Sequence, residues 1–246
     1  MQLWFCPLIA FLLGSIPFGL LMAKSRGIDI RQQGSGNIGA TNVLRVMGKK
    51  YGIACLLLDM LKGLIPTLLA LNWIRFEGQP TGMVIPCLLP LAHVLPSDQQ
   101  TLAQLLQVAT GLCAILGHNY SPWVGFKGGK GIATSAGVVI ALMPAAIVIL
   151  LLVWVLVFAL TRYVSVASMG AVGVLPLLTH MGARFHHLHN DPNLPTLWQA
   201  GTWNKPLLAF SVVVALLGIW KHRSNIKRLR HGTENRFEKR RKTQDC

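Results

Sequence analysis

The sequence predicts an all-α fold: a polytopic bundle of about seven transmembrane helices, with the N-terminus outside and the C-terminus inside. Three observations lead to this prediction. Hydrophobic residues make up 52% of the 246 residues and charged residues only 13%, whereas a soluble domain is about a quarter charged. Several apolar runs approach or reach the ~20 residues that a helix needs to cross a bilayer. The basic residues gather between and after these runs, as the positive-inside rule requires.

The first half of the chain contains three predicted spans. They cover residues 3–23, 52–72 and 102–117. Gly14, Pro17 and Gly19 interrupt the first run near its inner end, which a span tolerates when neighbouring groups satisfy the backbone. The apolar part of the 73–101 stretch is short and rich in proline, so we expect an outer-surface or re-entrant segment there.

The second half contains four predicted spans, although its first apolar run is ambiguous. Residues 132–160 could form one tilted helix or two helices divided at Pro144. Only two helices return Arg162 to the inner side and keep the basic C-terminal segment there. We therefore expect one helix on each side of Pro144, followed by spans at 164–181 and 206–220.

The charge distribution determines the predicted orientation. The inner segments 24–50, 118–131, 161–163 and 221–246 carry 6, 2, 1 and 10 Lys and Arg residues, whereas the outer segments carry three. This asymmetry explains most of the net charge of +15 without a nucleic-acid partner. Residues 1–235 are expected to form one integral-membrane domain, and residues 236–246 a polybasic cytoplasmic tail that faces the lipid surface.

The N-terminal run is expected to remain as the first span. No basic residue precedes it, and Lys24 and Arg26 follow it, which is the reverse of a cleaved signal peptide. The five cysteines show neither metal-ligand nor disulfide spacing, so we expect free thiols.

The first inner loop has the composition of an anion-binding loop. Within residues 31–45 it carries Gly34, Ser35, Gly36, Asn37, Gly39, Asn42 and Arg45. The glycines allow successive N–H groups to curve around an anion, and the polar side chains add donors. The last two residues would share one face of a helix whose N-terminus itself favours phosphate. A flexible glycine turn at the membrane surface is the alternative.

The second inner loop places two lysines around two glycines. Lys127, Gly128, Gly129 and Lys130 follow one another, so two ammonium groups and a backbone without side chains meet at one point. The loop is not a Walker A loop, because G-x-x-x-x-G-K-[ST] has no match in it. Lysines that only orient the next span are the alternative, and the glycines among them favour anion binding.

Other polar residues lie near the predicted inner surface. Arg162 forms a tight turn between two spans. His222 and Asn225 share a helix face after the last span, which a solvated polybasic helix would equally explain. Asp59 and Lys62 lie three residues apart within the second span. They are either functional or a structural ion pair near the interface, and the structural interpretation is slightly favoured.

Several segments carry a family resemblance when they are taken in order. They are Gly-Ser-Gly-Asn-Ile-Gly-Ala-Thr-Asn-Val-Leu-Arg, Gly-His-Asn-Tyr-Ser-Pro, Phe-Lys-Gly-Gly-Lys-Gly-Ile-Ala-Thr, Arg-Tyr-Val-Ser, His-Arg-Ser-Asn-Ile-Lys-Arg-Leu and Gly-Thr-Glu. Together they resemble the bacterial PlsY family of acyl-phosphate:glycerol-3-phosphate acyltransferases. One glycine-rich motif would be weak evidence, whereas several in order at predicted membrane boundaries are specific.

The resemblance implies an integral inner-membrane enzyme whose active site faces the cytoplasm. It implies transfer of a long-chain acyl group from acyl phosphate to the sn-1 hydroxyl of glycerol 3-phosphate. The products are lysophosphatidic acid and phosphate, in the first acylation step of phospholipid synthesis. The implied partners are these two substrates, membrane lipids and the soluble enzyme that makes acyl phosphate. No cofactor, metal or nucleic acid is implied.

The resemblance also assigns residues to the site. The implied catalytic residues are Ser35, Arg45, Lys127, His222 and Asn225. The implied substrate-binding residues are Gly36, Asn37, Asn42, His118, Gly128, Gly129, Lys130, Thr134, Arg162 and Glu234. Both substrates carry phosphate, so cationic groups suit such a site. His222 or His118 could take the hydroxyl proton. Because no Asp or Glu clearly supports either histidine, an oxygen of a bound phosphate is the favoured acceptor.

Three other functions fit the sequence less well. The H-x-x-x-x-D motif of another acyltransferase class occurs at His93–Asp98 and His186–Asp191, both on the predicted outer face. An organophosphate transporter would place its basic groups at the midplane, whereas here they lie on one face. A metal-dependent phosphotransferase needs converging carboxylates, and the inner ones, at positions 29, 234, 238 and 245, are scattered.

Overall fold

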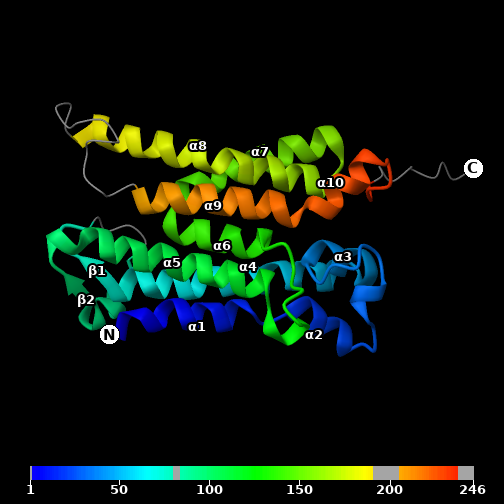
Figure 1. Cartoon of the computed structure of the whole chain (residues 1–246), viewed down its shortest axis with the longest axis horizontal. Helices are drawn as coiled ribbons and strands as arrows, with labels where there is room; N and C mark the ends of the chain where they lie inside the picture. The colour runs from blue at the N-terminus through cyan, green and yellow to red at the C-terminus, as the bar shows by residue number, and fades with distance from the viewer. Residues whose placement is uncertain (1, 80–83, 191–204, 238–246) are drawn as a thin grey trace, which may run out of the picture.

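The computed structural model describes residues 2–79, 84–190 and 205–237 and is predominantly helical. The first half of the chain forms α1 (Phe5–Gly14), α2 (Phe18–Lys24), α3 (Ala40–Met47), α4 (Lys49–Trp73) and α5 (Gln100–Asn119). The second half forms α6 (Ile132–Leu142), α7 (Pro144–Thr161), α8 (Val164–Asn190), α9 (Lys205–Lys221) and α10 (Arg223–Arg230). Short 3-10 helices cover Gln2–Trp4, Ile30–Gln32, Pro86–Leu91, Ser97–Gln99 and Pro122–Val124. The long helices lie side by side in one bundle (Figure 1).

Helices occupy all seven predicted membrane segments. Among the described residues, five stretches are long and apolar enough to cross a bilayer: Phe5–Lys24, Lys49–Trp73, Ser97–Val124, Pro144–Thr161 and Val164–Met181. The bent pair of α9 and α10 adds a sixth. The apolar α6 has 11 residues, and at 1.5 Å per residue it reaches only about half of the ~30 Å hydrocarbon core. The transmembrane helical bundle is confirmed, while a count of seven depends on this short helix.

The 132–160 run folds as two helices, as the charge distribution predicts. Met143 leaves the helical conformation with φ −145° and ψ 67°, and Pro144 is the first residue of α7. Proline is favoured there because the N–H that it lacks would have no partner inside the helix. Arg162 then ends α7 in the left-handed region, with φ 64°, so α7 and α8 are joined by a tight turn.

The first span is broken between α1 and α2, near Pro17. The Lys62 ammonium donates a hydrogen bond to the Ile16 carbonyl at this break, at 2.7 Å. It also forms an ion pair with Asp59 at 2.8 Å, and both side chains are almost fully buried. Irregular backbone within a membrane is tolerated when the protein satisfies its polar groups. The Asp59–Lys62 pair therefore stabilises this break, which agrees with the structural interpretation favoured from the sequence.

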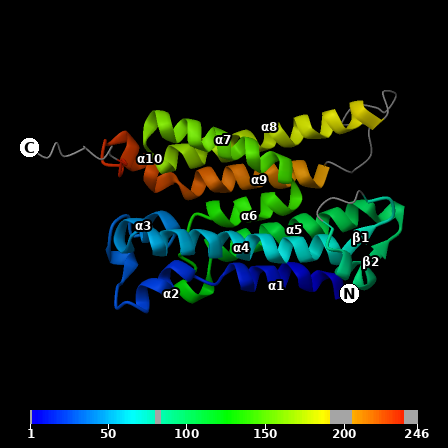
Figure 2. The ribbon, with the colours of Figure 1, turned by 180° about the vertical axis from the view of Figure 1, so that it is seen from behind.

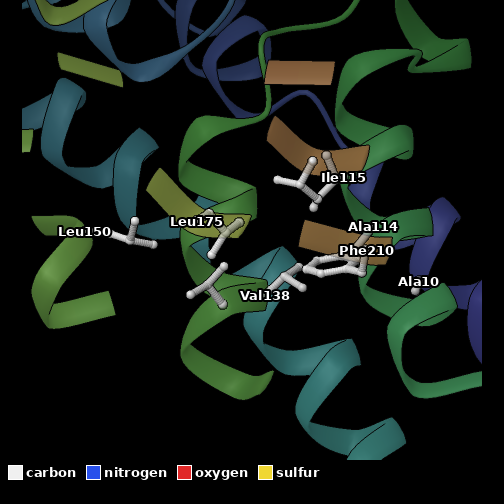
Figure 3. Packing of buried hydrophobic residues seen from close by; sticks show 9 residues of the cluster. Ala10, Ala114, Ile115, Val138, Leu150, Leu175 and Phe210 are labelled. Atoms are coloured by element: carbon white, nitrogen blue, oxygen red, sulfur yellow. The ribbon is translucent and has the colours of Figure 1, made fainter. Parts of the chain in front are cut away.

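The apolar core lies where helices from both halves of the chain meet. Figure 3 shows part of it, with Ala10, Ala114, Ile115, Val138, Leu150, Leu175 and Phe210 packed together. Close approach of α4 and α6 depends on glycine. A β-carbon at Gly63 would collide with the Thr134 carbonyl, and one at Gly137 with the Met60 carbonyl. Small residues allow helices to approach closely in membranes, where there is little hydrophobic force between them.

The helical bundle carries one small sheet that the sequence did not predict. The strands β1 (Ile74–Phe76) and β2 (His93–Leu95) form a small parallel sheet in which Ile74 lies opposite His93. Both belong to the 73–101 stretch that was expected to be an outer or re-entrant segment. The prolines of the 73–101 stretch prevent a regular α-helix there. The backbone N–H and C=O groups of β2 pair instead with β1, which directly follows α4. Gln107 of α5 anchors the sheet by donating to the Ile74 carbonyl at 2.6 Å.

The predicted inner segments lie together at one end of the bundle. Figures 1 and 2 show α2, α3 and α10 at this end, and the N-terminus, β1 and β2 at the other. We call the end formed by α2, α3 and α10 the polar end, because it carries both glycine-rich loops and the basic α10.

Candidate active site

A cavity of about 610 Å³ extends from the polar end into the bundle. Its polar lining consists of Ser35, Asn37, Thr41, Asn42, Arg45, Asp59, His118, Lys130, Ser135, Ser165, Ser168, His222, Asn225 and Glu234. Deeper, the lining becomes apolar and includes Ile140, Ile147, Leu151, Trp154 and Leu175. The volume is typical of a small-molecule site. The change from polar to apolar lining suits a ligand that has a charged head and a hydrocarbon chain.

Asn42 of α3 holds the first loop in shape. Its Oδ1 accepts a hydrogen bond from the Ser35 N–H at 2.8 Å, and its Nδ2 donates to the carbonyls of Ile30 and Gln33 at 3.2 and 3.0 Å. Gly34, at φ +60°, packs so closely on Oδ1 that a β-carbon would collide with it. The Asn42 amide thus positions the loop, and the Ser35 side chain lies on the cavity wall.

The two glycines of the second loop pack against the end of α5. The Gly129 N–H donates to the His118 carbonyl at 3.1 Å, so this N–H is not free to bind an anion. A β-carbon at Gly128 would collide with the same carbonyl, and one at Gly129 with the His118 ring. Neither glycine lines the cavity. The expected backbone anion site is therefore not formed at Gly129, and close packing against α5 explains both glycines.

The two lysines of this loop lie in different surroundings. Lys127 is exposed and does not line the cavity, whereas Lys130 lines it. Burial lowers the pKa of Lys130 to about 8, helped by the positive charges of Arg228 and Arg45 and opposed by Glu234. Within the described chain, no hydrogen bond or ion pair holds the Lys130 ammonium.

Arg45 is a second cation of the cavity without a counter-ion. Its Nη2 donates to the Asn235 carbonyl at 3.3 Å, and its guanidinium carbon lies 5.1 Å from the centre of the Phe237 ring. No carboxylate of the described residues forms an ion pair with it; the nearby Glu234 pairs with Arg228 instead. Two partly buried cations at one end of a cavity favour an anionic ligand there.

Glu234 fastens the C-terminal segment to the bundle. Its Oε1 accepts hydrogen bonds from Ser165 at 2.8 Å and Asn225 at 2.6 Å, and its Oε2 accepts one from Arg228 at 2.8 Å. Burial alone would raise the pKa of this carboxyl, but these bonds to its charged form lower it below the ordinary value. Because its oxygens are engaged by protein donors, Glu234 positions Asn225 rather than offering a free contact to a ligand.

Two residues after α9 leave acceptor atoms without hydrogen-bond partners in the described part of the chain. His222 places Nδ1 2.7 Å from the Gly218 carbonyl. A carbonyl only accepts, so Nδ1 carries the hydrogen and Nε2 is the acceptor in the neutral ring. Asn225 donates its amide to Glu234, and its buried Oδ1 has no partner among the described residues. A buried acceptor without a partner is costly, so a ligand hydroxyl at this wall would stabilise the site.

His118 has a carboxylate nearby, but that carboxylate does not hold the ring by a hydrogen bond. Asp59 Oδ1 lies 3.7 Å from His118 Nδ1, too far for a hydrogen bond. Asp59 is also committed to Lys62. The opposite edge of the ring packs against Gly129, so close packing fixes that edge of His118.

The remaining assigned residues lie outside the cavity lining. Gly36 forms a turn by donating its N–H to the Gln33 carbonyl, and Thr134 is buried in α6 against α4. Arg162 caps α7, and its carbonyl accepts the Phe237 N–H at 3.0 Å. Five polar lining residues were not assigned to the site from the sequence: Thr41, Asp59, Ser135, Ser165 and Ser168. Thr41 and Ser165 stand out among them. Both lie within the motifs that carry the resemblance, and that position was the available signal.

Of the two alternative H-x-x-x-x-D centres, the structure describes His93–Asp98, and neither of its two residues lines the cavity. His93 belongs to β2, at the end opposite the polar end (Figure 1), and the side chains of His186 and Asp191 lie outside the described residues. Among the residues that the structure describes, no three His, Cys, Asp or Glu side chains form a group that could hold a metal ion.

Comparisons with known proteins agree in sequence and in structure. The glycerol-3-phosphate acyltransferase family model matches residues 4–232. The chain is 40% identical to a glycerol-3-phosphate acyltransferase of Geotalea daltonii, over 94% of this chain and 95% of the relative. It is 38% identical to one of Aquifex aeolicus, over 96% of this chain and the full length of the relative.

The solved structures give the same result. A crystal structure of PlsY, an integral membrane glycerol 3-phosphate acyltransferase in its glycerol 3-phosphate form, matches with a TM-score of 0.71 and 36% identity, covering 97% of this chain and 96% of that one. Its lysophosphatidic acid form matches with a TM-score of 0.68 and 35% identity over the same shares. The sequence motifs, the bundle and these matches together lead to one conclusion: this chain belongs to the glycerol-3-phosphate acyltransferase (PlsY) family of integral membrane enzymes.

Proposed function

We propose that this acyltransferase moves a long-chain acyl group from acyl phosphate to the sn-1 hydroxyl of glycerol 3-phosphate. The observation that carries the proposal is the cavity that joins two cations without counter-ions, Arg45 and Lys130, to a deep apolar lining. The family supplies the acceptor class, since a relative was solved in a glycerol 3-phosphate form. The products are lysophosphatidic acid and inorganic phosphate.

The polar end of the cavity would bind glycerol 3-phosphate. Arg45 offers a planar fork to the phosphate and Lys130 a point charge, while the Ser35 hydroxyl can donate to a third oxygen. The unpartnered Oδ1 of Asn225 can accept a hydrogen bond from a glycerol hydroxyl. The acyl chain would follow the apolar lining past Trp154 and Leu175.

The reaction needs little covalent help from the protein. The sn-1 hydroxyl oxygen attacks the acyl carbonyl carbon, and the bond between that carbon and the phosphate oxygen breaks. The hydroxyl proton passes to an oxygen of the departing phosphate, and His222 Nε2 is the alternative acceptor. Cationic groups stabilise the charge that develops on the oxygens. Positioning and electrostatics then supply most of the rate enhancement.

The same proposal includes the orientation of the protein in the membrane and the source of its acyl phosphate. The polar end would face the cytoplasm at the inner membrane, since its segments carry most of the Lys and Arg residues. There it could receive acyl phosphate from the soluble enzyme that makes it. Residues 1–235 would act as one domain and the basic residues after it would lie against anionic lipid. Arg236 and Phe237 still pack on the domain.

Orientation can be tested with thiols already present. Cys87 is exposed near the end that carries β1 and β2, so an impermeant maleimide should label it from outside intact cells. Cys246 lies outside the described residues and is expected to be protected. Labelling of Cys246 but not Cys87 would reverse the proposed orientation.

The donor is tested with purified full-length protein in lipid nanodiscs. Glycerol 3-phosphate is offered with palmitoyl phosphate, palmitoyl-CoA or palmitoyl acyl carrier protein in parallel, and the acylated position of the product is determined. We expect turnover only with palmitoyl phosphate, at the sn-1 position, and unchanged by EDTA. Equal or faster turnover with palmitoyl-CoA, or loss of activity in EDTA that Mg²⁺ restores, would refute the proposal.

A further inference from the structure

The C-terminal segment 232–237, here called the strap, folds back onto the polar end. Glu234 anchors it at one point through Ser165, Asn225 and Arg228. Phe237 anchors it at a second point, because its N–H donates to the Arg162 carbonyl at 3.0 Å. The Asn235 carbonyl that accepts from Arg45 lies between these two anchors. The strap therefore presents a fixed acceptor to one edge of the Arg45 guanidinium.

An aromatic row fixes the face of the same guanidinium. The Phe237 ring lies 5.1 Å from the Arg45 guanidinium carbon, within the range of a cation–π interaction. Phe237 in turn packs edge-on against Phe158, with ring centres 5.8 Å apart, and Phe158 stacks on Trp154 at 5.1 Å. The row runs from a residue that lines the apolar cavity to the cation at its polar end.

We infer that Phe237 is a positioning residue for substrate phosphate: it holds the Arg45 guanidinium by its face while the Asn235 carbonyl holds one edge. This inference rests on the proposed function, in which Arg45 binds the phosphate of glycerol 3-phosphate. The guanidinium has five N–H donors, and the Asn235 carbonyl takes one. The others remain for an anion, and a fork that is already oriented loses less freedom on binding.

Phe237 lies beyond residues 4–232, which match the family model, so membership of the family does not assign it. It also lies in the stretch 236–246, which was expected to be a polybasic tail that faces the lipid surface. Its ring does not line the cavity, so it acts on the ligand only through Arg45.

The test measures the affinity of purified full-length variants for glycerol 3-phosphate by calorimetry. Phe237→Leu keeps apolar volume and removes the ring, whereas Phe237→Tyr keeps the ring. Loss of a cation–π contact should weaken binding of glycerol 3-phosphate about 2- to 30-fold in Phe237→Leu. Phe237→Tyr should bind as the wild type does. KM for glycerol 3-phosphate should rise with kcat nearly unchanged, because the lost contact stabilises the bound substrate and the transition state equally.

Two controls separate the possible failures. Phe126→Leu alters an exposed aromatic that carries no cation among the described residues, and it should leave affinity unchanged. In an Arg45→Ala background, Phe237→Leu should weaken binding no further, and this comparison holds even if Phe237→Leu lowers thermal stability. Equal losses in Phe237→Leu and Phe237→Tyr, wild-type affinity in Phe237→Leu, or additive effects with Arg45→Ala would overturn the role of Phe237. Wild-type affinity in Arg45→Ala alone would instead refute the proposed phosphate site.

Discussion

The Asn225 amide and the Glu234 carboxylate are joined by a hydrogen bond of 2.6 Å from Nδ2 to Oε1. The bond fixes which end of the amide faces the cavity, because only Nδ2 can donate to a carboxylate. Oδ1 is consequently held as an acceptor, buried and without a partner among the described residues. An acceptor fixed in this way is suited to a hydroxyl, and a glycerol hydroxyl is the nucleophile of the proposed reaction.

The first prediction concerns this amide. Asn225→Ala should lower kcat/KM for glycerol 3-phosphate by about 5- to 150-fold, the equivalent of one hydrogen bond of about 1–3 kcal/mol. Asn225→Asp should lower it further, because it places a second carboxylate beside Glu234. Steady-state kinetics with acyl phosphate measures both. An Asn225→Asp enzyme as active as the wild type would show that the donor to Glu234 is not needed.

The second prediction is a pH dependence set by Lys130, whose pKa of about 8 results mainly from burial. The charged form attracts phosphate, and it is lost as the pH rises through about 8. The second ionisation of phosphate, near pH 6, is already complete there. kcat/KM for glycerol 3-phosphate, which reports the free enzyme, should therefore fall above pH 8. Lys130→Arg should lack this fall, because a guanidinium stays charged.

Unfolding cannot account for that fall. A lysine whose pKa is lower in the folded protein binds more protons when unfolded, between the folded value and the ordinary 10.5. Stability rises with pH wherever the unfolded state binds more protons. The burial of charged Lys130 should thus become less destabilising as the pH rises from about 8 to 10, and thermal melting across that range is the control. A falling limb that persists unchanged in Lys130→Arg would assign it to another group.

The third prediction separates close packing from anion binding at the glycine pair. Gly129→Ala should lower the melting temperature and the activity, because its β-carbon would collide with the His118 ring. Adding His118→Ala removes that ring and should restore the melting temperature. Gly128→Ala meets the backbone carbonyl of His118, so His118→Ala should not rescue it.

A matched glycine provides the control for this experiment. Gly173 in α8 has open space where a β-carbon would lie, and its backbone is not left-handed, so Gly173→Ala should be neutral or slightly stabilising. If Gly129→Ala keeps its melting temperature yet loses affinity for phosphate, the glycine serves the anion directly and the packing explanation is wrong.

Local patterns were sufficient to predict the helices. Apolar runs, Pro17, Pro144 and the Lys and Arg distribution gave the segments, the broken first helix and the division of 132–160. The pairing of β1 with β2 was not predictable, because their partners Ile74 and His93 lie 19 positions apart along the chain and neither run has a strand-like alternation. Contacts between distant segments leave no periodicity in a sequence.

The site was predicted as a set of residues rather than as an arrangement. The motifs named Ser35, Arg45, His222 and Asn225, and the structure brings them to one cavity. Motif membership could not show that Lys130 lines the cavity while Lys127 is exposed, since the burial of a loop lysine depends on how the loop packs on the bundle. It docks through Trp123, whose indole N–H donates to the Ser15 hydroxyl at 2.8 Å, a contact across 108 positions. Arg236 and Phe237 were assigned to the tail for a similar reason, because the charge run that begins at Arg236 resembles a solvated tail.

The central claim is that a phosphate binds the cations inside the cavity, and the two lysines of one loop test it directly. The measurement is kcat/KM for glycerol 3-phosphate, with saturating acyl phosphate, in Lys130→Ala and Lys127→Ala. Lys130→Ala removes a charge-assisted hydrogen bond of about 1.5–3 kcal/mol and should cost about 10- to 150-fold. Lys127→Ala removes an exposed charge, worth about 1 kcal/mol or less, and should cost no more than about fivefold. Equal losses in the two variants, or a greater loss in Lys127→Ala, would contradict the account.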